Sequence, residues 1–123
     1  MKCPPIAALT AIRVATEPHE ATYPNPVRVR NGDEMFLDGR EEEWDGWRWL
    51  WASANGREGW VPDDLPVSVG RRCRAARDYS AMELSVKPGQ RLAVTGSTHG
   101  WAWCIDDDGD EGWVPERCLS DAD

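Results

Sequence analysis

The motif Gly-Trp-Val-Pro occurs twice in this 123-residue chain and constrains its fold more than any other feature. The copies stand at 59–62 and 112–115, and a glycine-containing turn precedes each of them. The match extends outward, because residues 45–49 (Asp-Gly-Trp-Arg-Trp) align with 99–103 (His-Gly-Trp-Ala-Trp), and 29–35 align with 86–92. A specific string seldom recurs by chance in so short a chain, so we interpret it as a duplicated unit of about 55 residues.

The turn residues of both copies predict β-structure. Asn55-Gly56 and Asp108-Gly109 are strong hairpin signals, because a type I′ turn needs positive φ at both central residues. Residues 87–90 (Lys-Pro-Gly-Gln) fit a type II turn. Short strands are expected at 11–15, 34–37, 47–52, 91–95 and 101–105. No helical period is sustained, so we predict an all-β protein of two small five-stranded barrels, joined by a linker at 67–72.

Charge and composition exclude several classes of function. The net charge is −8, and both halves of the chain are acidic, which argues against nucleic acid and membranes as partners. The four cysteines show no zinc-ligand spacing, which favours reduced thiols in a cytoplasmic protein. Residues 6–12 form a short apolar run with no cleavage site after it, so we expect neither a signal peptide nor a membrane span.

Four motifs in the second copy resemble those of SH3 domains. Residues 75–79 (Ala-Ala-Arg-Asp-Tyr) resemble the ALYDY motif, and 83–89 (Glu-Leu-Ser-Val-Lys-Pro-Gly) resemble the acidic-Leu-Ser stretch. Trp101 stands where the family has its first tryptophan, and 112–115 match its Gly-aromatic-Val-Pro motif. The chain is therefore similar to small bacterial proteins of two variant SH3 domains. We expect tandem SH3-like five-stranded barrels at 8–66, in divergent form, and at 72–120.

The resemblance implies a non-catalytic module that binds a protein or peptide. Aromatic ridges of the family grip a polyproline II ligand, and an acidic loop pairs with a ligand arginine or lysine. We therefore expect proline-rich or basic peptides as partners. Carried over position by position, the resemblance predicts peptide-binding residues in the second copy at Tyr79, Glu83, Trp101, Trp113 and Pro115. In the first copy it predicts Tyr23, Trp47, Trp60 and Pro62.

Two further interpretations remain open. Trp49 and Trp103 are predicted on the outer face of their strands, where a small domain seldom leaves so much aromatic area in solvent. Packing of the two domains, or a homodimer, would cover them, and the protein would then be a structural module whose grooves no longer bind. Cell-wall peptide binding is the other alternative.

No pattern predicts a cofactor, a metal site or catalysis. The acidic run at 106–111 lacks the glycine and glutamate positions of an EF-hand, so we interpret it as a hairpin turn. His19 and His99 have no partner nucleophile at a catalytic spacing. Cys118 follows Arg117, which is able to lower a thiol pKa, but we favour an inert thiol there.

Overall fold

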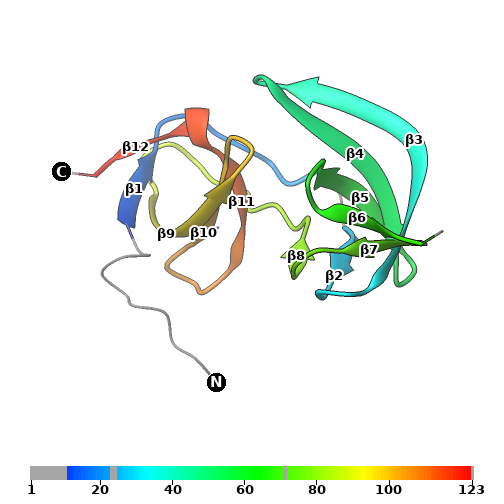
Figure 1. Ribbon diagram of the computed structural model, residues 1–123. Coiled ribbons are helices and arrows are strands. Elements are labelled where there is room, and N and C mark those ends of the chain that lie inside the picture. Colours follow the sequence, from blue (N-terminus) through cyan, green and yellow to red (C-terminus); the bar gives the residue numbers. More distant parts are fainter. Residues whose placement is uncertain (1–10, 23–24, 71, 123) are drawn as a thin grey trace. The chain divides into compact units, whose positions relative to one another are not determined.

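A computed structural model describes residues 11–22, 25–70 and 72–122 (Figure 1). Within these residues every regular element is a β-strand, apart from one 3-10 turn, so the predicted all-β class is confirmed. The chain divides into two compact units, and we describe each by itself. No helix in the described residues has the length and apolar character needed to cross a membrane.

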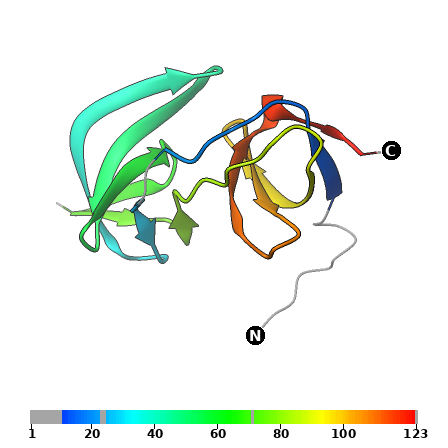
Figure 2. The same ribbon diagram turned by 180° about the vertical axis from the view of Figure 1, so that it is seen from behind.

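Unit 1 comprises Met1–Thr22 and Glu83–Asp123, so it is built from both ends of the chain. Its elements are β1 (Ala11–Ala15), β9 (Arg91–Thr98), β10 (Trp101–Ile105), β11 (Glu111–Pro115), η1 (Glu116–Cys118) and β12 (Leu119–Asp121). They form a five-stranded antiparallel sheet in the order β11-β10-β9-β1-β12, which curls on itself in Figures 1 and 2.

Unit 2 is the continuous segment Tyr23–Met82. Its elements are β2 (Arg28–Val29), β3 (Glu34–Trp44), β4 (Trp47–Ala54), β5 (Arg57–Pro62), β6 (Pro66–Val69), β7 (Arg72–Ala75) and β8 (Tyr79–Ser80). The sheet order is β5-β4-β3-β7-β6, the same pattern as in unit 1, and β2 pairs separately with β8. The chain thus contains two five-stranded units of one architecture.

The units do not coincide with the two sequence repeats, because the repeats exchange their first strands. β1 belongs to the first repeat but pairs with β9 and β12 of the second. β7 begins the second repeat but pairs with β3 and β6 of the first. Matching hydrogen bonds show that the exchanged strands are equivalent: Ala15 donates to the Gln90 carbonyl and Ala75 to the Asp33 carbonyl, each at 2.9 Å. Unit 2 is therefore inserted into the loop of unit 1 between β1 and β9.

The short connection between β6 and β7 explains this exchange, and it stands where the sequence predicted a linker at 67–72. The prediction was wrong, because these residues lie at the meeting ends of β6 and β7, which pair antiparallel from Pro66↔Ala75 to Val69↔Arg72. Only Gly70 and Arg71 separate the two strands, and Gly70 has φ +65. A connection of two residues gives a β-hairpin and is too short to carry β7 away from β6. β7 therefore completes unit 2.

Most predicted turns and strands are present. Asn55-Gly56 has φ 54 and 78, as a type I′ turn requires, and Gly89 has φ 92 at the predicted type II turn. Asp108-Gly109 is different, because positive φ occurs at Gly109 alone. There, Asp106 and Asp110 bracket a longer turn, in which the Asp106 amide donates to the Asp110 carbonyl.

Each unit has its own apolar core. In unit 1 the core joins Ala15 of β1 to residues from the other strands, from η1 and from the segment before β9, namely Leu84, Val86, Leu92, Ala102, Cys104, Val114, Cys118 and Leu119. The fully buried side chains of unit 2 include Val27, Met35, Val61 and Leu65. Ala75 of the exchanged strand is buried in the same way as Ala15, so each unit depends on a strand from the other repeat.

Candidate functional site

Polar and aromatic side chains meet in unit 1 where the segment after β1 runs beside the segment before β9. His19 and Val86 exchange backbone hydrogen bonds of 3.1 and 2.8 Å, which holds the two segments together. Nε2 of His19 lies 2.8 Å from Oε1 of Glu83, and the Thr22 hydroxyl donates to Oε2 of the same carboxylate at 3.3 Å. The His19 ring also meets the Trp101 ring edge-on, with 5.4 Å between centroids. This region of unit 1 therefore combines an acidic group with an aromatic surface.

A glycine of the repeated motif brings Glu83 to this place. A Cβ on Gly112 would lie 2.6 Å from the Glu83 carbonyl carbon and from the Leu84 nitrogen, so no other residue fits without a backbone shift. The Leu84 amide donates to the Trp113 carbonyl at 3.1 Å. In unit 2 the nearest atom to the corresponding Cβ on Gly59 is 3.2 Å away. Gly112 thus sets the distance between the acidic segment and β11.

The remaining residues of the motif have separate roles. Val61 and Val114 are fully buried and belong to the cores. Pro62 and Pro115 are also buried, and they pair across the sheet with Trp49 and Trp101. The prolines therefore position those tryptophans and present little surface of their own. Trp113 is half-buried and meets Trp103 edge-on at 5.1 Å.

A scan against family models matches the variant SH3 domain twice, at residues 13–65 and 70–120. The chain belongs to the variant SH3 domain family. The predicted tandem SH3-like fold is thereby confirmed. No curated protein and no solved structure matches the chain. SH3 domains are in general non-catalytic modules for protein interaction, which supports the coarse function expected from the sequence.

The strand exchange divides the site that was predicted for the second repeat. Glu83, Trp101, Trp113 and Pro115 belong to unit 1, but Tyr79 lies in β8 and belongs to unit 2. The equivalent of Tyr79 in unit 1 is His19, because His19 is bridged to Val86 as Tyr79 is paired with Val29. Sequence reasoning missed His19. Its position four residues after Ala15, as Tyr79 stands four residues after Ala75, was the available signal.

The first-repeat site also needs correction. Trp47 was matched to Trp101, since both follow a turn glycine, but the register shows otherwise. Trp101 pairs with Pro115, and the residue that pairs with Pro62 is Trp49. The β3–β4 hairpin extends two residues further before its Asp45-Gly46 turn, so Trp47 lies beyond the position equivalent to Trp101 and is 45% exposed. Tyr23, the remaining candidate, lies outside the described residues.

In unit 2 the tryptophan equivalent to Trp101 is covered by another side chain of the same unit. Trp49 is only 4% exposed, and the Trp44 ring lies against it with 5.5 Å between centroids. Trp44 also meets Trp60 edge-on at 5.3 Å, and Trp60 meets Trp51 at 5.0 Å. Trp44 comes from the part of the hairpin that has no counterpart in unit 1. The predicted binding residue Trp60 is thus engaged in an aromatic cluster.

The surroundings of the described cysteines do not favour their thiolate forms. Cys73, Cys104 and Cys118 are free thiols, and burial raises the pKa of each of them. Burial raises the pKa of Cys104 from 9.0 to about 11. For Cys118, burial outweighs the charge of Arg117, which lowers the pKa. An activated thiol at Cys118 is therefore not supported.

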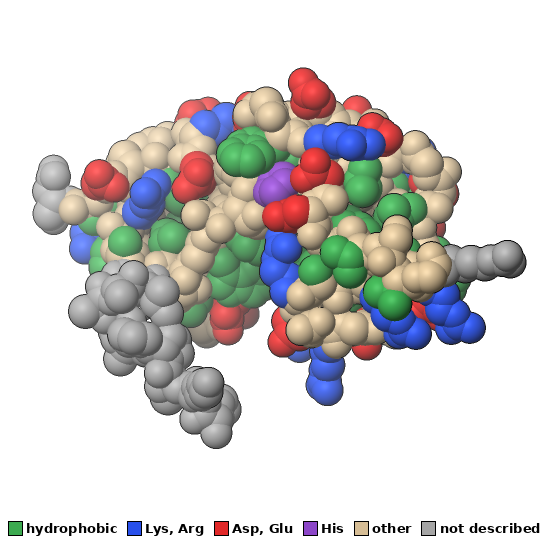
Figure 3. Space-filling model, in the orientation of Figure 1, with side chains coloured by type: hydrophobic (Ala, Val, Ile, Leu, Met, Phe, Trp, Pro, Cys, Tyr) green, Lys and Arg blue, Asp and Glu red, His purple; other side chains and the backbone are tan. Residues whose placement is uncertain are grey.

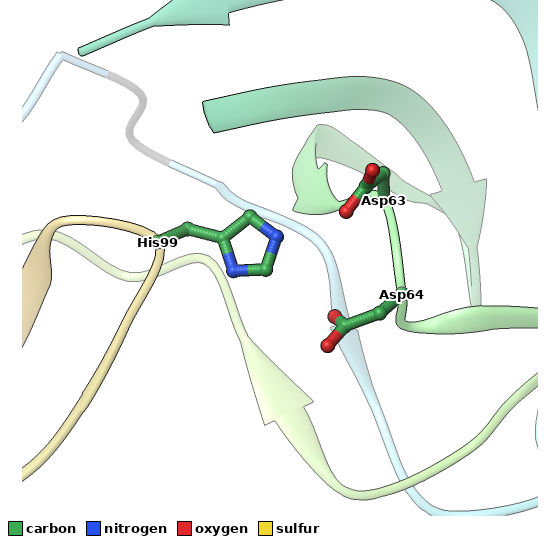
Figure 4. A group of neighbouring side chains, drawn as sticks. All are labelled: Asp63, Asp64 and His99. Atoms are coloured by element: carbon green, nitrogen blue, oxygen red, sulfur yellow. The ribbon is translucent and has the colours of Figure 1, made fainter. Parts of the chain in front are cut away.

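Two groups of acidic residues are explained by their own surroundings. The carboxylates of Asp106, Asp108 and Asp110 lie within 4.8 Å of one another, but Asp106 accepts the backbone amides of the other two and closes the turn. Figure 4 shows Asp63 and Asp64, which follow β5, and His99, which lies in the β9–β10 turn. They belong to different units: Asp64 accepts from Arg77 at 3.0 Å, and Nδ1 of His99 lies 2.9 Å from the Thr98 hydroxyl. We assign no metal site to either group.

Proposed function

We propose that the chain is a non-catalytic binding module and that unit 1 carries the active groove. Its ligand is an extended, proline-rich peptide segment with a basic residue. The observation that supports this proposal is the placement of the Glu83 carboxylate beside His19, whose ring in turn meets Trp101, all in one unit. Flat aromatic surface suits proline rings, and a nearby carboxylate suits an arginine or lysine of the peptide.

Glu83 is a suitable acidic group because it is held in place and shielded. Its side chain is only 15% exposed, and both its oxygens accept hydrogen bonds from unit 1. A carboxylate with little exposure is weakly screened by salt, so a ligand cation gains more there than at the open surface. Trp101 and Trp113 are half-buried, which leaves part of each ring for contact with a peptide.

Unit 2 is the weaker candidate because Trp44 already contacts the aromatic residues of its groove. A peptide that docked on Trp49 or Trp60 would first have to displace the Trp44 ring. The acidic residue is missing as well: Val27, the counterpart of Leu84, follows Pro26 where Leu84 follows Glu83. The two units therefore share a fold but offer different surfaces.

An amide chemical-shift titration of the labelled chain with a proline-rich peptide that carries one arginine tests the proposal. Trp101→Ala should weaken binding about 30-fold or more, because a central aromatic anchor contributes roughly 2 kcal/mol or more. Trp47→Ala is the matched control, since it removes an exposed tryptophan of unit 2. Glu83→Gln should weaken binding of the arginine-containing peptide. It should leave nearly unchanged the binding of a second peptide in which glutamine replaces that arginine.

Three results would contradict the proposal. The first is the absence of any shift at millimolar peptide. The second is an equal loss of affinity for Trp47→Ala and Trp101→Ala. The third is a set of shifts confined to unit 2.

The alternative function, a structural module that packs through Trp49 and Trp103, is weakened by the contacts of these two residues. Trp49 packs on Trp44, and Trp103 donates from Nε1 to Glu111 at 2.9 Å. Each ring is thus engaged within its own unit, so neither requires a second copy to cover it. Light scattering over a range of concentrations tests this directly, and a mass that doubles with concentration would restore the homodimer.

A further inference from the structure

A cavity of about 290 Å³ lies in unit 2, at the end where the Asn55-Gly56 turn joins β4 to β5. It is lined by Arg28, Val29, Arg30, Asp33, Asn55 and Arg57. This end of β4 is opposite to the Asp45-Gly46 turn, near which Trp44 and Trp49 lie, so the cavity is separate from the contact between these two tryptophans. Figure 3 shows basic and acidic side chains side by side along the lower edge of the surface that carries unit 2.

The charges of the cavity contrast with the rest of the protein. Three arginines line it in a chain of net charge −8. Four other arginines of unit 2, Arg40, Arg48, Arg72 and Arg77, form ion pairs within the unit, and Arg74 donates to the Gly32 carbonyl. Among the described residues, Arg28, Arg30 and Arg57 form none at 4.0 Å or less. Their guanidinium groups are therefore available to an external anion.

The walls of the cavity are held by hydrogen bonds rather than left loose. The Asn55 side-chain amide donates to the Arg28 carbonyl and to Oδ2 of Asp33, both at 3.2 Å. The same Oδ2 accepts the Arg30 amide at 2.9 Å, and this bond is the main cause that lowers the Asp33 pKa. These bonds tie the β4–β5 turn to β2 and to the segment after it. Binding would consequently order few additional groups.

The fold itself does not require arginines here. In unit 1 the equivalent of Arg57 is Asp110, because Asp106 and Asp110 close the β10–β11 turn as Ala54 and Arg57 close the β4–β5 turn. Arg28 corresponds to Ser85, by the pairing of their neighbours Val29 and Val86. Arg30 corresponds to Lys87, by the alignment of 29–35 with 86–92, so the same place in unit 1 carries one basic, one acidic and one hydroxyl side chain. The cluster of three arginines occurs in unit 2 and is not repeated at these positions of unit 1.

We propose that this cavity binds the phosphate group of a phosphate monoester. Three guanidinium charges and one carboxylate charge leave two positive charges, which match a phosphate dianion. Guanidinium groups bind phosphate oxygens in pairs of parallel hydrogen bonds, and a monoester offers three terminal oxygens for three arginines. A carboxylate offers two oxygens and one charge, so it satisfies the site less well.

The test is an amide chemical-shift titration of the full chain at constant ionic strength. The probes are inorganic phosphate, a short peptide with one phosphoserine, the same peptide without the phosphate, and acetate. We expect saturable shifts at residues 28–33 and 55–57 with both phosphate probes. Tighter binding of the phosphopeptide would identify a modified protein as the source, and equal binding would identify free phosphate.

Two variants that remove the same charge distinguish a specific phosphate site from general electrostatic attraction of phosphate to the protein. Arg57→Gln should weaken phosphate binding about tenfold or more, because it removes charge-assisted hydrogen bonds. Arg48→Gln is the control, since it removes the same charge from unit 2 at a residue already paired with Glu41. Equal weakening by both variants, shifts that never saturate, or acetate binding as tight as phosphate binding would overturn the proposal. Because the site lies in unit 2, its failure is independent of peptide binding by unit 1.

Discussion

The exchange of first strands makes a sharp prediction about two alanines. Ala15 is 1% exposed in the core of unit 1, and Ala75 is 2% exposed in unit 2. We expect Ala15→Asp to unfold unit 1, which holds most of the second repeat, and to leave unit 2 folded. If each repeat instead kept its own first strand, the same substitution would unfold the barrel of the first repeat.

The expected cost is close to the whole stability of one unit. A carboxyl group with an ordinary pKa of about 3.9 that must stay protonated in the core at pH 7 costs about 4 kcal/mol. Its added volume costs about 1–3 kcal/mol more. A unit of about 60 residues has a free energy of unfolding of roughly 3–9 kcal/mol. The substitution should therefore leave unit 1 largely unfolded at 25 °C.

The eight tryptophans give a direct assay. Unit 1 contains Trp101, Trp103 and Trp113, and unit 2 contains Trp44, Trp47, Trp49, Trp51 and Trp60. In an amide spectrum, the three indole resonances of unit 1 should collapse to unfolded positions in Ala15→Asp, while the five of unit 2 persist. Collapse of the five with retention of the three would refute the strand exchange.

Ala75→Asp is the reciprocal variant. It should unfold unit 2 and leave unit 1 folded around a long loop. Because unit 2 is inserted in unit 1, that loop grows to about 60 residues, and its closure lowers the stability of unit 1 by about 2 kcal/mol. Ala15→Asp is therefore the sharper of the two experiments, and Ala75→Asp should shift the melting temperature of unit 1 downward without abolishing its transition.

Three further predictions follow from single contacts. Trp44→Ala should lower the free energy of unfolding of unit 2 by about 1–3 kcal/mol, because two aromatic contacts are lost, and denaturant titration measures it. It should also red-shift the tryptophan fluorescence, and an unchanged spectrum would show that Trp44 does not cover Trp49. Gly112→Ala should lower the free energy of unfolding of unit 1 by about 1–3 kcal/mol and move the His19 and Glu83 resonances. Gly59→Ala, where a Cβ has more space, should lower the free energy of unfolding of unit 2 by less. Equal losses would contradict the role given to Gly112. Cys104 has a pKa raised from 9.0 to about 11 by burial, so its protonated form favours the folded state, and unit 1 should lose stability as pH rises from 9 to 11. Denaturant titrations at pH 8 and pH 10 measure this loss of stability, and it should be smaller in Cys104→Ala than in the unchanged protein. An identical loss in both proteins would exclude Cys104 as its source.

Local patterns in the sequence were enough to predict the architecture of each unit. Positive φ at Asn55 and Gly56 follows from their residue types, and the strand at 101–105 follows from alternation. The Gly-Trp-Val-Pro repeat located two equivalent strands, whose valines both lie in a core. These features depend on neighbours in the chain, so the sequence alone determined them.

The composition of the site was only partly predictable, because register is a property of paired strands. The motif residues Glu83 and Trp101 were identified, but the equivalence of Trp49 with Trp101 depends on where the β3–β4 hairpin turns. Two extra residues before Asp45 move the turn outward and place Trp47 away from the groove. His19 was missed because its role depends on a strand pairing that crosses between the repeats.

Only the tertiary structure decided which strand completes which unit. The two repeats share one fold, so β1 and β7 have equivalent places in either barrel, and no local preference distinguishes the two arrangements. The two-residue connection between Val69 and Arg72 settles the choice, because it is long enough for a hairpin but too short to carry β7 to another sheet. β7 then occupies the place beside β6 in unit 2, and β1 takes the corresponding place beside β12 in unit 1.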